Sequence, residues 1–362
     1  MIVEKLQLQN FRNYSHTDVK FFSGLNILQG SNVQGKTNLL EAIYFCSIGK
    51  SLRASREKEI IKFGENFAKI NLEIRKKVKK TAISLYFSKN TKKTVKINNI
   101  PIKRISELMG EFNAIYFSPD ELKMIKEKPE DRRRFMDIHI SQTSKQYFYL
   151  ISRYEKILLN RNKLLKSPAD KNNIKETIDI WDTGLAESGS KIILFRNDFL
   201  KNLKPYAEKV HQYLTSNKEN LMLEYGGEKD EDLELLKKKF LSALKQNFDK
   251  DIKLGYTTFG PHRDDIKVSV NDIDIRSYGS QGQQRTVALS LKLAELEIMY
   301  QETNDMPILI LDDVLSELDS KRRERLLKFC VKAQTFISGT DFPELKNAHY
   351  YKVENGTIKL DK

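Results

Sequence analysis

Gly30-Ser31-Asn32-Val33-Gln34-Gly35-Lys36-Thr37 matches the pattern G-x-x-x-x-G-K-[ST], the phosphate-binding P-loop. The preceding residues 24–29 have a turn glycine and a short apolar core, and they predict a buried strand. Residues 38–45 carry apolar side chains at helical spacing and predict a helix that begins at the loop. In this order the backbone N–H groups of the loop and the positive end of the helix dipole bind phosphate oxygens. We therefore expect Lys36 to reach the β- and γ-phosphates of a nucleotide and Thr37 to bind Mg²⁺.

The composition describes a globular chain of 362 residues, 40% of them hydrophobic and 31% charged. This length allows one large domain or two to three smaller ones. No apolar run has the length of a membrane span and the N-terminus lacks a signal-peptide core, so we expect a cytoplasmic protein with no membrane partner. Cys46 and Cys330 lie far apart in apolar stretches and predict buried free thiols. None of the five histidines pairs with a cysteine at ligand spacing, so zinc is not expected.

Positive charge is concentrated in one part of the chain. The formal net charge is +14, and residues 50–134 hold 23 Lys and Arg against 11 Asp and Glu. Such a field favours a polyanionic partner, with DNA or another nucleic acid as the first choice, but an ordinary solvated face explains the charge equally well. Alternating stretches at 69–75, 82–87 and 94–97 predict an antiparallel sheet with one wet, lysine-rich face.

Two groups of basic residues in this region are candidates for DNA contacts. The first group surrounds a predicted hairpin tip and comprises Lys76, Lys77, Lys79 and Lys80. The second group, Arg132 and Arg133, lies in a predicted helix that begins near residue 130. Each group has a plain alternative: a hairpin tip that binds nothing, and a helix surface held by salt bridges.

The N-terminal 23 residues predict two antiparallel strands that lead into the P-loop strand, with a turn at residues 11–14. Arg12 in this turn is placed to reach the phosphates of a bound nucleotide. An arginine that simply faces solvent is an equally good interpretation.

Residues 141–250 predict a helical insertion. Apolar residues keep helical spacing over 150–165, 178–199, 206–214 and 231–248, with breaks at 166–170 and 225–228. No heptad pattern persists, so we expect short antiparallel helices rather than an extended coiled coil.

Two polar loops follow the insertion. The loop Gly260-Pro261-His262-Arg263-Asp264-Asp265 is dense in ionisable groups, but no nucleophile lies nearby, so we expect it to order itself or to contact DNA or nucleotide. The second loop, Ser280-Gln281-Gly282-Gln283, directly precedes a clear helix. The Ser280 hydroxyl and the Gly282 backbone N–H are suited to bind a phosphate at that helix start.

Residues 308–313 predict the second half of a metal–nucleotide site, of which the P-loop is the first half. Residues 308–311 predict a buried parallel strand that ends in Asp312 and Asp313. We expect Asp312 to hold Mg²⁺ through water and Asp313 to orient or deprotonate an attacking water. Residues 334–341 predict a final core strand that ends in a polar loop.

The order of these motifs, ending in Ser316-Glu317-Leu318-Asp319, resembles an ATP-binding-cassette head. The opening Leu8-Gln9-Asn10-Phe11-Arg12-Asn13-Tyr14 resembles the SMC-like branch, and within that branch the chain is most similar to the RecF family. Further matching segments are 116–120, 132–135, 260–265, 279–285 and 310–319. The resemblance implies an α/β fold, an ABC-type (SMC-like) P-loop ATPase head with mixed sheets and a helical insertion lobe. It would divide the chain into head residues 1–140, a helical lobe at 141–250 and head residues 251–362.

The resemblance also implies a function. RecF-like proteins are ATP- and Mg²⁺-dependent DNA-binding proteins that form homodimers around two nucleotides. The loop Ser280-Gln281-Gly282-Gln283 of one subunit would close on the γ-phosphate held by the P-loop of the other. Hydrolysis would be slow and DNA-dependent, a switch rather than a metabolic activity. The family acts at gapped or junction DNA and works with RecR to place RecA on single strands.

Three departures and four alternatives accompany this interpretation. Asp313 stands where such heads usually carry Glu, Thr340 occupies the usual switch-histidine position, and residues 116–120 contain no Q-loop glutamine.

Another SMC-like head or a transporter's nucleotide-binding subunit would share the P-loop and acid pair. Two further alternatives belong to different functional classes: a kinase of small molecules and a purely structural DNA-bridging protein. ATP-dependent dimerisation separates these, because a kinase or an ATP-independent bridge would not show it.

Overall fold

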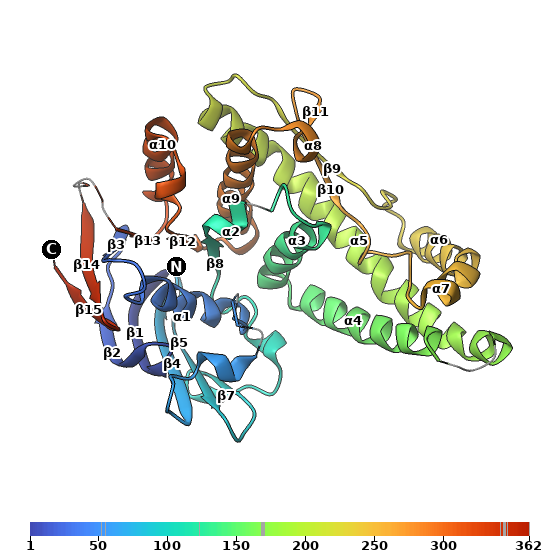
Figure 1. Ribbon diagram of the computed structural model, residues 1–362, viewed down its shortest axis with the longest axis horizontal. Helices are drawn as coiled ribbons and strands as arrows, with labels where there is room; N and C mark the ends of the chain where they lie inside the picture. Colours follow the sequence, from blue (N-terminus) through green and yellow to red (C-terminus); the bar gives the residue numbers. More distant parts are fainter. Residues whose placement is uncertain are drawn as a thin grey trace.

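A computed structural model describes residues 1–362 except 52, 55, 123, 168–170, 341, 343, 344, 346 and 362. Figure 1 shows two parts: a head built on two sheets, which contains both termini, and a lobe of long helices beside it. The predicted α/β architecture with a helical lobe is confirmed (Figure 1). In the described residues, no helix is both long and apolar enough to cross a bilayer.

The first sheet of the head is antiparallel and has the strand order β2-β1-β4-β5-β6-β7. Its strands alternate buried and exposed side chains, as expected for a sheet with one face on the core and one in water. The predicted N-terminal hairpin is its β1–β2 pair. The strands are β1 (Ile2–Phe11), β2 (Tyr14–Lys20), β4 (Phe67–Arg75), β5 (Lys80–Ser88), β6 (Thr94–Ile97) and β7 (Ile100–Pro101).

The second sheet has the order β15-β14-β3-β13-β12-β8 and is parallel from β14 to β8. Its central strands β12 and β13 are buried at every residue, and β12 is a continuous apolar run up to Asp312. The carboxyl ends of β3, β12 and β8 meet at one edge, where the site lies. The strands are β3 (Leu25–Gln29), β8 (Ala114–Phe117), β12 (Ile308–Asp312), β13 (Thr335–Gly339), β14 (Ala348–Glu354) and β15 (Thr357–Leu360).

Helix α1 (Lys36–Ile48) lies between the two sheets of the head. Its residues Leu39, Ile43 and Phe45 are fully buried in one core with side chains from both sheets. The opposite face of the parallel sheet packs on a second core that continues into the helical lobe. Because α1 is buried almost all round, its first turn, which carries the P-loop lysine, has a fixed position relative to the strand ends.

The helical lobe is joined to the head by α3 (Pro129–Thr143) and by α9 (Gln281–Thr303) (Figure 1). A three-stranded sheet, β9-β10-β11, lies along the long helix α5. The helices are α2 (Pro119–Leu122), α3 (Pro129–Thr143), α4 (Lys145–Leu165), α5 (Lys171–Thr215), α6 (Leu233–Gln246), α7 (Phe248–Leu254), α8 (Ile275–Tyr278), α9 (Gln281–Thr303) and α10 (Ser320–Cys330), and the strands are β9 (Leu221–Tyr225), β10 (Ile266–Val270) and β11 (Ile273–Asp274). Three 3₁₀ turns cover Glu57–Ile60, Ile105–Glu107 and Leu315–Glu317.

Three details of the predicted elements are wrong. Helix α5 is one helix that contains Pro205, where the sequence suggests two. Leu203 and Ala207 are fully buried on either side of the proline, so packing outweighs its local cost. The sequence predicts a helical region around residues 221–225, but these residues form strand β9 because they pair with β10. Strand β13 is not the last core strand, because β14 joins the sheet on the other side of β3. The predicted break at 166–170 lies partly outside the described residues.

Candidate nucleotide site

The P-loop folds back on itself around Lys36. The Lys36 Nζ donates to the carbonyl oxygens of Gly30 at 2.6 Å and Ser31 at 2.8 Å. Burial lowers the pKa of Lys36, and the carboxylates of Asp313 and Asp312 oppose that shift. The ammonium group is therefore held at the mouth of the loop, beside the first turn of α1 and the acid pair.

Both P-loop glycines are required by contacts with other segments. A Cβ on Gly30 would lie 2.3 Å from the carbonyl oxygen of Val353 in β14. Gly35 has φ 118°, a left-handed conformation, and a Cβ there would lie 2.7 Å from Nδ2 of Asn13. The motif positions are therefore fixed by the packing of the loop as well as by any phosphate it binds.

Two hairpin turns support the P-loop from outside. In the β1–β2 turn, Asn13 Nδ2 donates to Gln34 O at 3.0 Å and the Tyr14 hydroxyl donates to Gly35 O at 3.0 Å. In the β14–β15 turn, the backbone N–H of Asn355 donates to Gln34 Oε1 at 2.7 Å. The sequence contains no signal for these contacts, because both partners are distant in the chain.

Asp312 accepts hydrogen bonds from three strands or helices at once. Thr37 Oγ1 donates to its Oδ1 at 3.0 Å, Ser338 Oγ donates to the same oxygen at 2.6 Å, and the Tyr116 hydroxyl donates to Oδ2 at 2.6 Å. The structure thus joins Thr37 and Asp312, as the sequence predicts. Tyr116 and Ser338 are site residues that sequence reasoning missed, because no local pattern assigns either of them a role beside the carboxylate.

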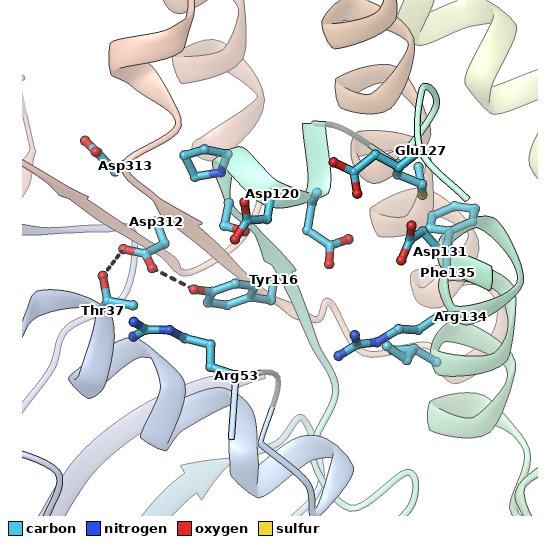
Figure 2. Close-up of a pocket in the computed structure, with 15 residues that line it drawn as sticks. Thr37, Arg53, Tyr116, Asp120, Glu127, Asp131, Arg134, Phe135, Asp312 and Asp313 are labelled. Carbon is cyan, nitrogen blue, oxygen red and sulfur yellow. Dashed lines mark hydrogen bonds between the residues drawn. The ribbon is translucent and has the colours of Figure 1, made fainter. Parts of the chain in front are cut away.

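A cleft of about 470 Å³ opens beside this carboxylate (Figure 2). Thr37, Tyr116 and Asp313 line one side, and Arg134 and Phe135 of α3 line the other. Two guanidinium groups face it, Arg53 from the head and Arg134 from the lobe; the sequence predicts neither as a nucleotide ligand. The remaining lining residues are Ser118, Pro119, Asp120, Glu121, Met124, Glu127, Asp131, Ile138 and Asp312.

The donor set fits a magnesium–nucleotide ligand. Mg²⁺ prefers hard oxygen ligands and binds through one or two protein oxygens plus phosphates and water. The Thr37 hydroxyl and the Asp312 carboxylate supply two such oxygens at hydrogen-bond distance from each other. No group of three or more His, Cys, Asp or Glu side chains suited to a metal occurs in the described part of the chain.

Asp313 occupies the rim of the cleft. It is an exposed residue with φ 56°, and its backbone N–H donates to Ser338 Oγ at 3.0 Å. Left-handed backbone is tolerated by Asp and Asn far better than by most residues. Its side chain lines both this cleft and the neighbouring hollow that contains Thr340. Its expected role toward water stays a prediction.

The loop Ser280-Gln281-Gly282-Gln283 is a helix cap outside the cleft. Ser280 caps α9 by accepting from the Gln283 backbone N–H at 3.2 Å, and Gln283 Oε1 accepts from the Ser280 backbone N–H at 3.1 Å. Gln281 lines a second hollow, which shares Pro119 and Glu127 with the cleft. Within one chain, therefore, this loop does not line the cleft that Thr37 and Asp312 line.

Arg12 is bonded to α1 and to the Glu59 carbonyl. Its Nε and Nη2 bind the two oxygens of Glu41 at 3.0 and 2.8 Å, and its Nη1 donates to the Glu59 carbonyl. In this structure the bidentate pair ties the β1–β2 turn to α1, and the expected contact of Arg12 with nucleotide phosphates stays a prediction.

Arg132 and Arg133 do not lie on an open surface, which corrects their assignment to DNA. The Arg132 side chain is 3% exposed and its Nε lies 2.6 Å from Asp265 Oδ1. Arg133 donates to the Asp264 carbonyl at 2.7 Å. Together they fix the loop at residues 260–265, which agrees with the expectation that this loop orders itself.

The hairpin lysines are also engaged. Lys76 Nζ donates to the Gly110 carbonyl at 3.0 Å and is largely buried, so it is not available to DNA. Lys79 lies 3.3 Å from Glu111 and Lys80 lies 3.1 Å from Glu4. The Lys77 side chain reaches Asn304 at 3.5 Å. These exposed pairs are weak. In the described residues three of the four lysines pair with two carboxylates, Glu111 and Glu4, so the hairpin tip keeps a net positive charge.

The fold and the site together define an ATP-binding-cassette head of the SMC type. The family model described as RecF/RecN/SMC N terminal domain matches residues 2–350, and the chain belongs to this family. An SMC head solved with the C-winged helix domain of ScpA has a TM-score of 0.58 at 16% identity, a likeness that shows the fold alone.

Closer similarity is to RecF. The chain is 45% identical to the DNA replication and repair protein RecF of Alkaliphilus oremlandii, over 96% of this chain and 95% of that protein. It is 43% identical to RecF of Clostridium novyi over 99% of both. The structure described as "the recombination mediator protein RecF-ATPrS in RecFOR pathway" matches with a TM-score of 0.92 and 36% identity, covering 99% of this chain and 98% of that one. The chain is a member of the RecF family of DNA replication and repair proteins, not a transporter subunit.

Proposed function

We propose that this chain is an ATP-dependent DNA-binding protein of recombinational repair and replication restart, whose dimerisation is controlled by nucleotide. The observation that carries the proposal is the contact between Thr37 and Asp312 at the edge of a cleft that begins at the P-loop. Two solved relatives are described as RecF-ATPrS and RecF-ATP, which supports ATP as the nucleotide.

The residues have distinct roles in this proposal. The P-loop amides and the start of α1 bind the phosphates, and Lys36 exchanges its bonds to Gly30 and Ser31 for phosphate oxygens. Thr37 and Asp312 hold Mg²⁺, which supplies positive charge to the phosphate oxygens when bound. Asp313 orients the attacking water and accepts its proton. Because Asp is shorter than Glu, we expect slow turnover that times a switch.

A second copy of the chain completes the site. The loop that begins at Ser280 lies outside the cleft of its own chain, so it is free to meet the P-loop of a partner subunit. A nucleotide bound between two copies stabilises the dimer by mass action. We further propose gapped or junction DNA as the target and RecR as the partner with which the protein places RecA on single strands.

Sizing the protein with and without Mg²⁺ and a non-hydrolysable ATP analogue tests this function, with DNA present and absent. We expect a monomer alone, a dimer with the analogue, and tighter DNA binding by the dimer that weakens steeply with added salt. Lys36→Met removes the phosphate contact and should abolish the nucleotide effect, whereas Lys250→Met on the exposed face of α7 should not. A chain that stays monomeric when saturated with the analogue, and binds DNA no better for it, would overturn the proposal.

A further inference from the structure

The antiparallel sheet of the head has a polar outer face, turned away from α1. The strand register places Gln9, Lys69, Tyr86 and Thr94 in one row across β1, β4, β5 and β6. The neighbouring row contains Asn71 and Lys96. We call this surface the outer sheet face, defined by Gln9, Phe67, Lys69, Asn71, Tyr86 and Lys96. In Figure 1, β4 and β5 lie on the side of the head away from the long helix α5.

The outer sheet face is hollowed. A groove of about 730 Å³ follows it, and the residues that define the face all line that groove. None of the groove's lining residues lines the nucleotide cleft, so the two sites are separate. A ligand in the groove would not need ATP to be bound.

Two aromatic rings form a platform in this groove. The rings of Phe67 and Tyr86 are stacked, with centroids 5.7 Å apart and planes inclined by 23°. Tyr86 is 39% exposed, an unusual position for a large ring on a polar sheet face. An exposed ring of this kind has one face available for stacking on a flat ligand.

Two lysines beside the platform are free of ion pairs. In the described part of the chain, neither Lys69 nor Lys96 forms an ion pair. The other basic groups near this sheet do: Lys5 lies 3.0 Å from Asp18, and Lys80 lies 3.1 Å from Glu4. One carboxylate, Glu73, also lines the groove. The unpaired charge is therefore positive around the rings, which suits a phosphate backbone.

We propose that the outer sheet face binds single-stranded DNA, with a base stacked on Tyr86 and phosphates held by Lys69 and Lys96. A duplex keeps its bases stacked on each other, out of reach of a ring on a sheet, so the platform selects an unpaired strand. The amides of Gln9 and Asn71 offer donors and acceptors to base edges. This inference rests on the proposed DNA-binding function, to which it adds the surface that meets an unpaired strand.

The test measures binding of a labelled oligothymidylate of about 20 nucleotides by fluorescence anisotropy, without nucleotide. Tyr86→Ala should weaken binding roughly 5- to 150-fold, because stacking contributes about 1–3 kcal/mol for each base. The double variant Lys69→Gln/Lys96→Gln should reduce the slope of log K against log salt by about 1.4, roughly 0.7 for each phosphate that is no longer neutralised. The matched control, Lys79→Gln/Lys80→Gln, alters two engaged lysines of the same sheet region and should change neither quantity.

A triple variant, Tyr86→Ala/Lys69→Gln/Lys96→Gln, separates this inference from the proposed function. All three side chains face solvent or the groove, so the variant should fold and should still dimerise with the ATP analogue. Loss of oligothymidylate binding with dimerisation retained supports the inference. Wild-type oligothymidylate binding by the triple variant overturns the inference and leaves the ATP-controlled dimer standing. Equal losses for a blunt duplex, or binding of oligouridylate but not oligothymidylate, would also overturn it.

Discussion

The hydroxyl of Tyr116 donates to Oδ2 of Asp312 at 2.6 Å, so the end of β8 holds the carboxylate at the end of β12 (Figure 2). The two strands are parallel neighbours, with Ile310 opposite Tyr116. Burial raises the pKa of Tyr116 well above its ordinary value, and the charge of Asp312 raises it further. The phenol therefore stays protonated and remains a donor, which holds the Asp312 carboxylate in its orientation toward Thr37.

Replacing Tyr116 by phenylalanine should reveal this contact. Tyr116→Phe removes one charge-assisted hydrogen bond from a buried carboxylate, which should lower the free energy of unfolding by about 1–3 kcal/mol. It should also raise the Mg²⁺ concentration needed for nucleotide binding, because Asp312 is less well oriented. Urea unfolding and Mg²⁺ titrations measure the two effects. Tyr278→Phe is the control, since that tyrosine is 80% exposed. Wild-type behaviour of the Tyr116→Phe variant in both assays would contradict the assigned role.

Asp313→Asn tests the residue on the rim of the cleft. Asn tolerates the left-handed backbone at this position, so the fold should be retained. The amide is not able to accept the proton of an attacking water, so we expect dimers that form with ATP but dissociate far more slowly than wild type. Size-exclusion chromatography after removal of free ATP measures this lifetime. Asp272→Asn, also at a left-handed position, is the control. Rapid turnover by the Asp313→Asn variant would remove Asp313 from the hydrolytic role.

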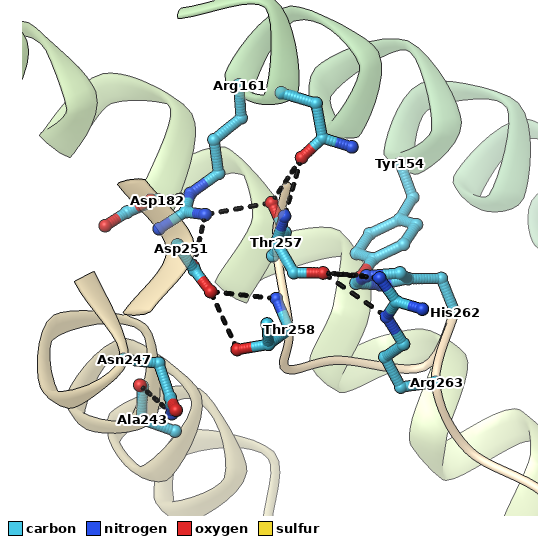
Figure 3. Close-up of polar contacts among 11 residues, drawn as sticks. Tyr154, Arg161, Asp182, Ala243, Asn247, Asp251, Thr257, Thr258, His262 and Arg263 are labelled. Carbon is cyan, nitrogen blue, oxygen red and sulfur yellow. Dashed lines mark hydrogen bonds and ion pairs between the residues drawn. The ribbon is translucent and has the colours of Figure 1, made fainter. Parts of the chain in front are cut away.

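His262 makes the stability of the helical lobe depend on pH (Figure 3). Its Nδ1 lies 2.7 Å from the Tyr154 hydroxyl, and its Nε2 lies 3.0 Å from the Thr257 carbonyl, an arrangement that suits the neutral ring. Burial is the main cause that lowers the pKa of His262 to about 4. The unfolded chain binds this proton near pH 6.5, so the neutral ring stabilises the fold above pH 6.5 and that stability is lost as the pH falls toward 4.

The size of this effect follows from the shift in pKa. The loss in unfolding free energy should reach at most about 3 kcal/mol at the acid end of the range from pH 6.5 to about 4. His262→Gln does not titrate, so the difference in unfolding free energy between wild type and variant should shrink as the pH falls from 6.5 to about 4. Urea unfolding of both proteins across that range measures it. A difference that stays constant with pH would show that His262 is not held neutral.

Arg161 joins three helices of the lobe through buried ion pairs (Figure 3). Its Nε lies 2.6 Å from Asp182 of α5, and its Nη1 lies 2.7 Å from Asp251 of α7; the arginine side chain is fully buried. Arg161→Met would leave two buried carboxylates without their cation and should destabilise the fold by about 3–5 kcal/mol. Arg153→Met on the same helix, where the pair with Glu187 is exposed, should cost less than about 1 kcal/mol. Thermal unfolding compares the two, and equal losses would contradict the buried network.

The parts of the site that the sequence predicts are those encoded by local chemistry. Gly30, Gly35 and Lys36 belong to one short loop whose strand and helix flanks have their own periodicity. Asp312 follows a strand that is apolar at every position. Their meeting could be expected because the ends of parallel strands share an edge.

The parts that sequence reasoning missed depend on partners far along the chain. Arg132 looks like an exposed helical arginine until Asp265, 133 residues away, is packed against it. Arg12 binds Glu41 through two of its three guanidinium nitrogens, a contact that its place in a turn does not predict. Tyr116 and Ser338 acquire roles only because β8 and β13 lie on either side of β12. Pairing order and register, which no local pattern encodes, decide these roles.

The support of Gln34 by the β14–β15 turn has a consequence for biosynthesis. Gln34 is made 321 residues before Asn355, which belongs to the turn that holds the P-loop. A nascent chain halted before residue 348 carries the whole P-loop sequence without the strand that packs on Gly30. The loop therefore reaches its packed shape only once β14 and the following turn have been made, so we expect a shorter nascent chain to bind ATP more weakly.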